Sequence, residues 1–131
     1  MTSTETHKGS GETILVIDDI EDQRKITSSM MSELGYSVST VSSGEEAVEF
    51  LKNNSIDLLL LDMLMEPGMD GLDTYKKILQ LHPGQKAIIV SGFSETDRVK
   101  EAQRLGAGKC IRKPYTLQEI AIAVKNEIEK R

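Results

Sequence analysis

The sequence predicts an α/β fold in which five parallel strands alternate with five helices in a doubly wound (βα)5 sandwich. Short apolar runs alternate along the chain with amphipathic stretches of helical length, and three of the runs are continuously apolar. Strands that are covered by helices on both faces have this continuous pattern. Crossovers between parallel strands are right-handed, which places helices on both faces of the sheet. The length of 131 residues suits a single domain.

Five segments have the pattern of a strand. Residues 13–18 (TILVID), 57–62 (DLLLLD) and 86–91 (KAIIVS) are expected to be the central strands. Residues 36–41 (YSVSTV) alternate apolar and polar side chains, which predicts an edge strand with one solvated face. Residues 109–112 give a weaker pattern and are expected to form the fifth strand.

The helices between these strands carry start and stop signals. Three starts have the spacing of a capping box: Ser43 with Glu46, Ser94 with Asp97, and Thr116 with Glu119. Gly35 and Gly106 are expected to end two helices. Apolar residues at helical spacing give each helix one face to lay on the sheet, as in the stripes Ile26, Met30, Leu34 and Leu117, Ile120, Val124, Ile128.

Composition excludes several classes of protein. Apolar residues make up 38% and charged residues 28% of the chain, a balance that argues against a disordered or membrane protein. The net charge of −5 repels nucleic acid, so no direct nucleic-acid partner is expected. The single cysteine, Cys110, excludes an internal disulfide, which with the polar N-terminus favours the cytoplasm. Residues 1–11 are small and polar and are expected to be a flexible lead or linker, with the folded domain spanning 12–131.

Chemically active side chains follow several of the predicted strands directly. Asp18 and Asp19 come at the end of the first apolar run, Asp62 ends the third, Ser91 ends the fourth and Lys113 follows the fifth. In a doubly wound sheet, ligands bind beyond the carboxyl ends of the strands. We therefore expect these five side chains to meet at one edge of the sheet.

The three carboxylates predict a cation site. Carboxylates that lie close together repel one another unless a cation sits among them. Oxygen ligands suit Mg²⁺, for which Mn²⁺ could substitute. A carboxylate such as Asp62 can act as a nucleophile toward phosphorus if the ion and Lys113 neutralise the charge. Phosphoryl transfer of this kind needs no general base, and neither His7 nor His82 is expected to be catalytic.

The same residues, in the same order, resemble the response-regulator receiver domains of two-component systems, from about Thr13 to the end of the last helix. The resemblance maps the family's acidic pair onto Asp18 and Asp19, its phosphorylated aspartate onto Asp62, its hydroxyl switch residue onto Ser91, and its Lys-Pro pair onto Lys113 and Pro114. The segment Met69-Asp70-Gly71 is similar to the family's turn after the phosphorylation site. The family's fold is the flavodoxin-like sandwich with strand order 2-1-3-4-5.

The resemblance also implies a mechanism and partners. The phosphoryl group would come from the phosphohistidine of a sensor histidine kinase or a histidine phosphotransfer domain. Asp19, Asp62 and the main-chain carbonyl of Leu64 would bind the cation directly, and Asp18 would bind it through water. Lys113 would pair with the phosphate across a cis bond to Pro114, and Ser91 would turn inward to bond a phosphate oxygen. Such a protein is a signalling phosphoacceptor, with only self-catalysed phosphoryl transfer and autodephosphorylation. It would be a monomer or weak dimer that acts on another protein without binding a membrane.

Three features depart from the usual family pattern. The loop after Asp62 is one residue longer, through Glu66. Cys110 occupies the switch position in the fifth strand where many members carry an aromatic residue. Leu64 and Phe93 put bulk where the phosphate lifetime is usually tuned. The stretches DMLMEPGMDGLDTY and IIVSGFSETDRV most resemble receivers attached to hybrid sensor kinases.

Each of these side chains also has an ordinary structural interpretation. Asp18 and Asp19 could cap a helix, Asp62 could enter a turn, and Ser91 and Lys113 could be loop residues. Taken together this account needs several coincidences at one sheet edge. Two other functions are compatible with the fold: a phosphate-independent interaction module, suggested by the longer loop and Cys110, and flavin binding. The segment IDDIEDQ after the first strand lacks the Ser/Thr/Gly-rich phosphate loop that a flavin would need.

Overall fold

The structure, a computed structural model, describes residues 8–65, 67–92 and 96–130. In these residues the chain forms one parallel sheet in the order β2-β1-β3-β4-β5. The strands are β1 (Thr13–Ile17), β2 (Ser37–Val41), β3 (Leu58–Asp62), β4 (Ala87–Ser91) and β5 (Cys110–Arg112). The helices are α1 (Glu21–Glu33), α2 (Gly44–Leu51), α3 (Gly71–Leu81), α4 (Asp97–Arg104) and α5 (Leu117–Glu129). The predicted fold class and strand order are confirmed.

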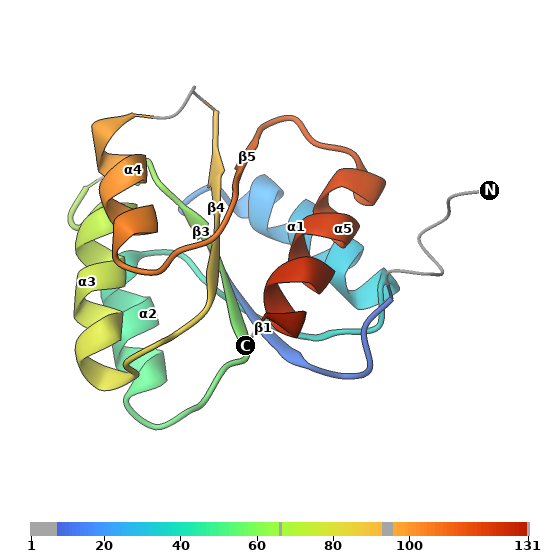
Figure 1. Cartoon of the computed structure of the whole chain (residues 1–131), viewed down its shortest axis with the longest axis horizontal. Coiled ribbons are helices and arrows are strands. Elements are labelled where there is room, and N and C mark those ends of the chain that lie inside the picture. Colours follow the sequence, from blue (N-terminus) through green and yellow to red (C-terminus); the bar gives the residue numbers. More distant parts are fainter. Residues whose placement is uncertain (1–7, 66, 93–95, 131) are drawn as a thin grey trace.

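The helices form a layer on each face of the sheet (Figure 1). Helices α1 and α5 cover one face, and α2, α3 and α4 cover the other. Alternate side chains of β3 serve the two cores: Leu58 and Leu60 pack with α1 and α5, whereas Leu59 and Leu61 pack with the other three helices. Every residue of β3 and β4 is buried, as their continuous apolar runs predict. Strand β2 is only partly buried and lies at the sheet edge, as its alternating pattern predicts.

The buried face of α1 differs from the predicted one. Ile26 is 50% exposed, whereas Thr27, Met31 and Leu34 are buried against the sheet. The predicted stripe was therefore wrong at Ile26, whereas its other two members, Met30 and Leu34, do pack against the core. The spacing of apolar residues does not predict that a threonine is buried. Thr27 is buried because its hydroxyl finds a partner, the hydroxyl of Tyr115, from a distant part of the chain.

Helix capping follows the predicted signals at two of three starts. Thr116 and Glu119 form a complete capping box at α5. Ser43 caps α2 by accepting a hydrogen bond from the Glu46 N–H, although the Glu46 carboxylate bonds Ser42 instead. The cap of α4 is Thr96, which accepts from the Val99 N–H, and the predicted Ser94 lies outside the described residues.

Gly35 and Gly106 end α1 and α4 as predicted. Their backbone φ angles are +94° and +127°, in the left-handed region that favours glycine. The stop signals in the sequence were therefore correct.

Part of the expected flexible lead is bonded to the domain. The N–H groups of Gly9 and Gly11 donate to the carbonyls of Leu34 and Gly35, and Lys125 Nζ donates to the carbonyl of Lys8. An added Cβ at Gly9 would lie 2.1 Å from the Tyr36 ring. Residues 8–11 thus lie on the turn between α1 and β2. Their polar composition did not predict this, because backbone groups make the contacts.

In the part of the chain that the structure describes, none of the helices combines the length and the apolar composition that a membrane span requires.

Candidate functional site

Three carboxylates meet beyond the carboxyl ends of β1 and β3. The two strands pair in register with Ile17 opposite Leu61, so that Asp18 and Asp62 follow side by side. Oxygen atoms of Asp18, Asp19 and Asp62 all lie within 4.8 Å of one another. Asp18 and Asp62 are each only 5% exposed, and Asp19 is more accessible. The predicted acidic cluster is therefore present at the predicted sheet edge.

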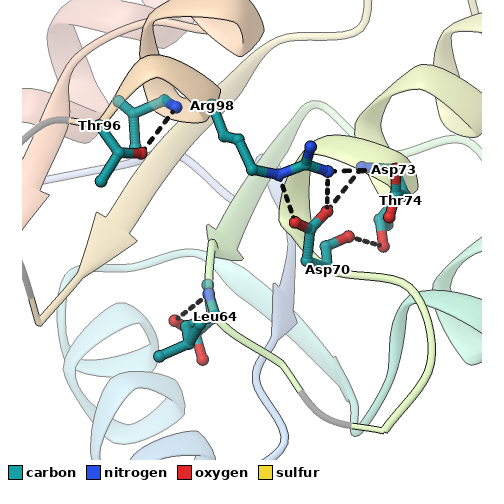
Figure 2. Close-up of polar contacts among 8 residues, drawn as sticks. Leu64, Asp70, Asp73, Thr74, Thr96 and Arg98 are labelled. Atoms are coloured by element: carbon teal, nitrogen blue, oxygen red, sulfur yellow. Dashed lines mark hydrogen bonds and ion pairs between the residues drawn. The ribbon is translucent and has the colours of Figure 1, made fainter.

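Local hydrogen bonds fix two of these carboxylates. Asp18 Oδ1 accepts from the Ile20 N–H at 2.9 Å, which orders the turn between β1 and α1. The Leu64 N–H lies 3.4 Å from Asp62 Oδ1, a long contact that is drawn in Figure 2. In both cases a side chain accepts from the backbone two residues on, the local bond that short acidic side chains favour in turns.

Lys113 brings positive charge to the cluster. Its Nζ lies 3.0 Å from Asp18 Oδ2 and 3.7 Å from Asp62 Oδ1, and its side chain is 19% exposed. Its backbone N–H donates to the carbonyl of Ser91 at 2.7 Å, which ties the end of β5 to the end of β4. The bond from Lys113 to Pro114 is cis, as the resemblance implied.

The electrostatics of the site favour a cation. Burial raises the pKa of Asp62 to about 6, an effect that Lys113 opposes and Asp18 reinforces. One lysine thus does not balance the three carboxylates. The donor set consists of oxygen atoms only, on short side chains at one sheet edge, and this fits Mg²⁺.

A cavity of about 330 Å³ lies between the loop after β3 and the start of α4. Ser91, the last residue of β4, lines it and is 4% exposed. The rest of the lining comes from the loop after β3 and from the start of α4: Met63, Leu64, Asp70, Thr96, Asp97 and Arg98. The cavity thus lies beyond the carboxyl ends of β3 and β4, the neighbouring strands that end at Asp62 and Ser91.

Comparison with known proteins decides what kind of site this is. Residues 14–125 match the model of the response regulator receiver domain. The chain belongs to this family. Receiver domains are phosphoacceptors of two-component signalling, they interact with histidine kinases or phosphotransfer proteins, and they bind Mg²⁺ through an acidic cluster.

Individual relatives of the receiver differ greatly in length. The receiver is 32% identical over 114 residues to sporulation initiation phosphotransferase F of Bacillus subtilis, and the match covers 87% of this chain and 91% of that protein. It is 33% identical over 118 residues to the autoinducer 1 sensor kinase/phosphatase LuxN of Vibrio campbellii, covering 90% of this chain but 14% of LuxN. Receivers within hybrid kinases are thus among its relatives.

Solved structures agree with the fold. The CheX-CheY-BeF3-Mg²⁺ complex of Borrelia burgdorferi contains a chain that matches the receiver with a TM-score of 0.87 and 26% identity. That match covers 98% of this chain and 100% of the chain in the complex.

The receiver also has a charged link that the sequence did not predict (Figure 2). Arg98, in the first turn of α4, donates to both carboxylate oxygens of Asp70 at 2.6 and 2.9 Å and to Asp73 at 3.2 Å. Burial alone would raise the pKa of Asp70, but the bonds from Arg98 and from the Asp73 N–H outweigh it and lower that pKa. The link joins the first turns of α3 and α4, two walls of the cavity. Sequence patterns could not find it, because its partners are 28 residues apart.

The other described residues that the sequence singled out lie at the edge of the site or away from it. Leu64 is 56% exposed at the rim of the cavity, and Cys110 is partly buried against the core on the α2–α4 side. Glu66 and Phe93 lie outside the described residues, as does His7. His82 lies after α3, at the opposite end of the sheet, where its ring bonds the Leu51 carbonyl. The side chains that meet at Asp62 are thus the predicted Asp18, Asp19 and Lys113, and Ser91 ends the neighbouring strand.

Proposed function

We propose that Asp62 is the phosphoacceptor of this receiver and takes the group from a phosphohistidine of a sensor kinase or a histidine phosphotransfer domain. The observation that carries the proposal is the position of its carboxylate, buried at the end of β3 with Lys113 Nζ at 3.7 Å and two further carboxylates close by. Uncompensated burial of several like charges is costly. Such a cluster is retained where it binds charged ligands.

The chemistry follows from this arrangement. A carboxylate oxygen of Asp62 attacks phosphorus, the bond from phosphorus to the donor imidazole nitrogen breaks, and the imidazole leaves with the electron pair. The product is an aspartyl phosphate. Lys113 neutralises part of the charge on the transferred group, and Ser91, at the end of the neighbouring strand, donates its hydroxyl to a phosphoryl oxygen. Positioning and electrostatic stabilisation suffice for this reaction. We propose no activity of the receiver beyond this transfer and the hydrolysis of its own aspartyl phosphate.

We propose that Asp18, Asp19, Asp62 and the main-chain carbonyl of Leu64 hold Mg²⁺, or Mn²⁺ in its place. The ion supplies positive charge between the carboxylates and the incoming phosphoryl group. Asp18 already has Lys113 Nζ at 3.0 Å, which suits it to a contact through water rather than a direct one. Asp19 is the most accessible of the three and is suited to bind the ion directly.

The test is phosphorylation by a small-molecule donor. Incubation of the receiver with acetyl phosphate and Mg²⁺ is expected to add one phosphoryl group, measured by intact-mass spectrometry, and a chelator is expected to prevent it. Addition of beryllofluoride is expected to shift the amide NMR signals of the site in the presence of Mg²⁺. A folded sample that responds to neither reagent would favour a phosphate-independent interaction module instead.

Removal of one cation ligand gives a first prediction. Asp19→Asn is expected to weaken Mg²⁺ binding at least about tenfold, because it removes one negative ligand while the fold stays intact. Calorimetric titration with Mg²⁺ measures the change. The matched control is Asp22→Asn, which removes an exposed carboxylate from the first turn of α1 outside the cluster. Equal affinities of Asp19→Asn and the control would remove Asp19 from the ligand set.

A second prediction concerns how a protein donor reaches Asp62. Among the described residues, three of the four large exposed apolar side chains, Ile20, Ile26 and Leu64, belong to α1 or the loops beside the site. Ile26 also lines a hollow of about 350 Å³ with Pro114 and Tyr115. Exposed apolar residues that border a functional site are suited to contact a protein partner.

We therefore expect Ile26→Glu to slow transfer from a phosphorylated histidine phosphotransfer domain by about tenfold or more, and to leave labelling by acetyl phosphate unchanged. Leu81→Glu, which alters the fourth exposed apolar residue at the far end of α3, is the control and is expected to retain both rates. An Ile26→Glu receiver that accepts phosphate from the protein donor at the normal rate would place the docking surface elsewhere.

A further inference from the structure

A buried pair of hydroxyl groups lies next to the site, on the side of α1. The Thr27 hydroxyl and the Tyr115 hydroxyl are 2.5 Å apart. Thr27 is 5% exposed and belongs to the helix face that lies on the sheet. Tyr115 follows Lys113 by two residues, in the loop between β5 and α5. The bond therefore joins α1 to the loop that carries the lysine of the site.

Helix α1 makes a second contact of this kind one turn earlier. Arg24 Nη1 donates to the main-chain carbonyl of Asp18 at 2.8 Å. Arg24 and Thr27 are three residues apart and so lie on the same side of the helix. One face of α1 thus holds both loops whose charged side chains meet at Asp62: the loop after β1 through Arg24, and the loop after β5 through Thr27.

The position of Lys113 depends on such support. A lysine side chain carries its compact ammonium group on a flexible stem of four carbons. The stem by itself does not fix the position of the ammonium group. On one side, the backbone of Lys113 is held by the Ser91 carbonyl. On the other side, the hydrogen bond between the hydroxyls of Tyr115 and Thr27 attaches the loop to α1.

We propose that Thr27 and Tyr115 are positioning residues for the phosphoryl transfer. Their hydroxyl bond holds the segment 113–115 against α1, which keeps Lys113 Nζ between Asp18 and Asp62. This inference rests on the proposed role of Asp62. It assigns to the two hydroxyls an effect on the rate of transfer that passes through Lys113 and does not pass through the cation.

A purely structural role would have different consequences. The Tyr115 ring packs against the core beneath α1 and α5, so its loss would affect folding whatever the hydroxyl does. Tyr115→Phe keeps the ring and removes the hydroxyl alone. Thr27→Val keeps the shape of the buried side chain, and Thr27→Ser restores the hydroxyl. Tyr36→Phe is a matched control, because within the described residues the buried Tyr36 hydroxyl of the same core has no hydrogen-bond partner.

The experiment measures the dependence of the labelling rate on acetyl phosphate and Mg²⁺ concentration. Tyr115→Phe and Thr27→Val are each expected to lower the maximal rate about threefold to tenfold, with little change in Mg²⁺ affinity. The double variant is expected to be no slower than either single variant, because the two hydroxyls act as one pair. Thr27→Ser and Tyr36→Phe are expected to label at the wild-type rate.

The decisive measurement uses a receiver that lacks the lysine. In the Lys113→Ala background, Tyr115→Phe is expected to cause no further loss of rate. A further loss of the same size as in the wild type would overturn the proposal, as would a wild-type rate in Tyr115→Phe. If the wild type itself is not labelled, the role of Asp62 fails and this inference fails with it; labelled wild type with an unaffected Tyr115→Phe refutes the inference alone.

Discussion

Replacement of Asp62 by Asn is expected to abolish phosphorylation completely while the receiver stays folded. Asn has nearly the same shape and fits the buried position, but its amide is not a nucleophile toward phosphorus. The change also removes a buried carboxylate. Burial raises the pKa of this group to about 6. We therefore expect the variant to melt no lower than the wild type in the absence of Mg²⁺. Intact-mass spectrometry after incubation with acetyl phosphate and Mg²⁺ measures the labelling.

The control for this experiment lies at the other end of the same strand. Asp57 precedes β3, and its carboxylate accepts from the Thr13 N–H, away from the acidic cluster. Asp57→Asn is expected to retain a single phosphoryl group. Labelling of Asp62→Asn to the wild-type level would show that another residue accepts the group and would end the proposed mechanism.

Replacement of Lys113 by Ala is expected to slow phosphorylation by about a hundredfold, the usual effect of removing one group that stabilises charge in the transition state. The ammonium group lies 3.0 Å from Asp18 and 3.7 Å from Asp62, and no other cationic side chain is within ion-pair distance of either in the described residues. The variant is also expected to melt at a lower temperature without Mg²⁺, because two buried carboxylates lose their ion-pair partner.

Stopped-flow or quench-flow measurement of labelling gives the rate, and thermal unfolding with and without Mg²⁺ gives the change in stability. Lys109→Ala is the control, since Lys109 precedes β5 and is exposed. A Lys113→Ala receiver that is labelled as fast as Lys109→Ala would show that the cation alone neutralises the phosphoryl charge.

The sequence predicted the main parts of the candidate site because they are set by strand ends. The runs that end at Ile17 and Leu61 are apolar on both faces, so the first polar residues after them must lie at the sheet edge. In a parallel sheet these ends share one edge. The position of Asp18, Asp19 and Asp62 in one cluster follows from this local pattern and from the strand order.

No local sequence pattern predicted the side-chain contacts that support the site. Thr27 and Tyr115 are 88 residues apart, and Arg98 and Asp70 are 28 apart. A threonine and a tyrosine that bond each other look in sequence like any polar and any aromatic residue. The same pairing explains the error at Ile26, because Thr27 could be buried only once its hydroxyl had a partner.

By itself, the sequence determined the order of strands and helices, the glycines that end α1 and α4, and the acidic and basic groups at the strand ends. These depend on hydrophobic periodicity and backbone preference, which act over a few residues. Only the tertiary structure decided which face of α1 is buried, how residues 8–11 lie on the α1–β2 turn, and which hydroxyls and charges hold the loops around Asp62. These depend on hydrogen bonds between distant side chains and backbone groups, whose free energy is gained only when the packed chain brings donor and acceptor together.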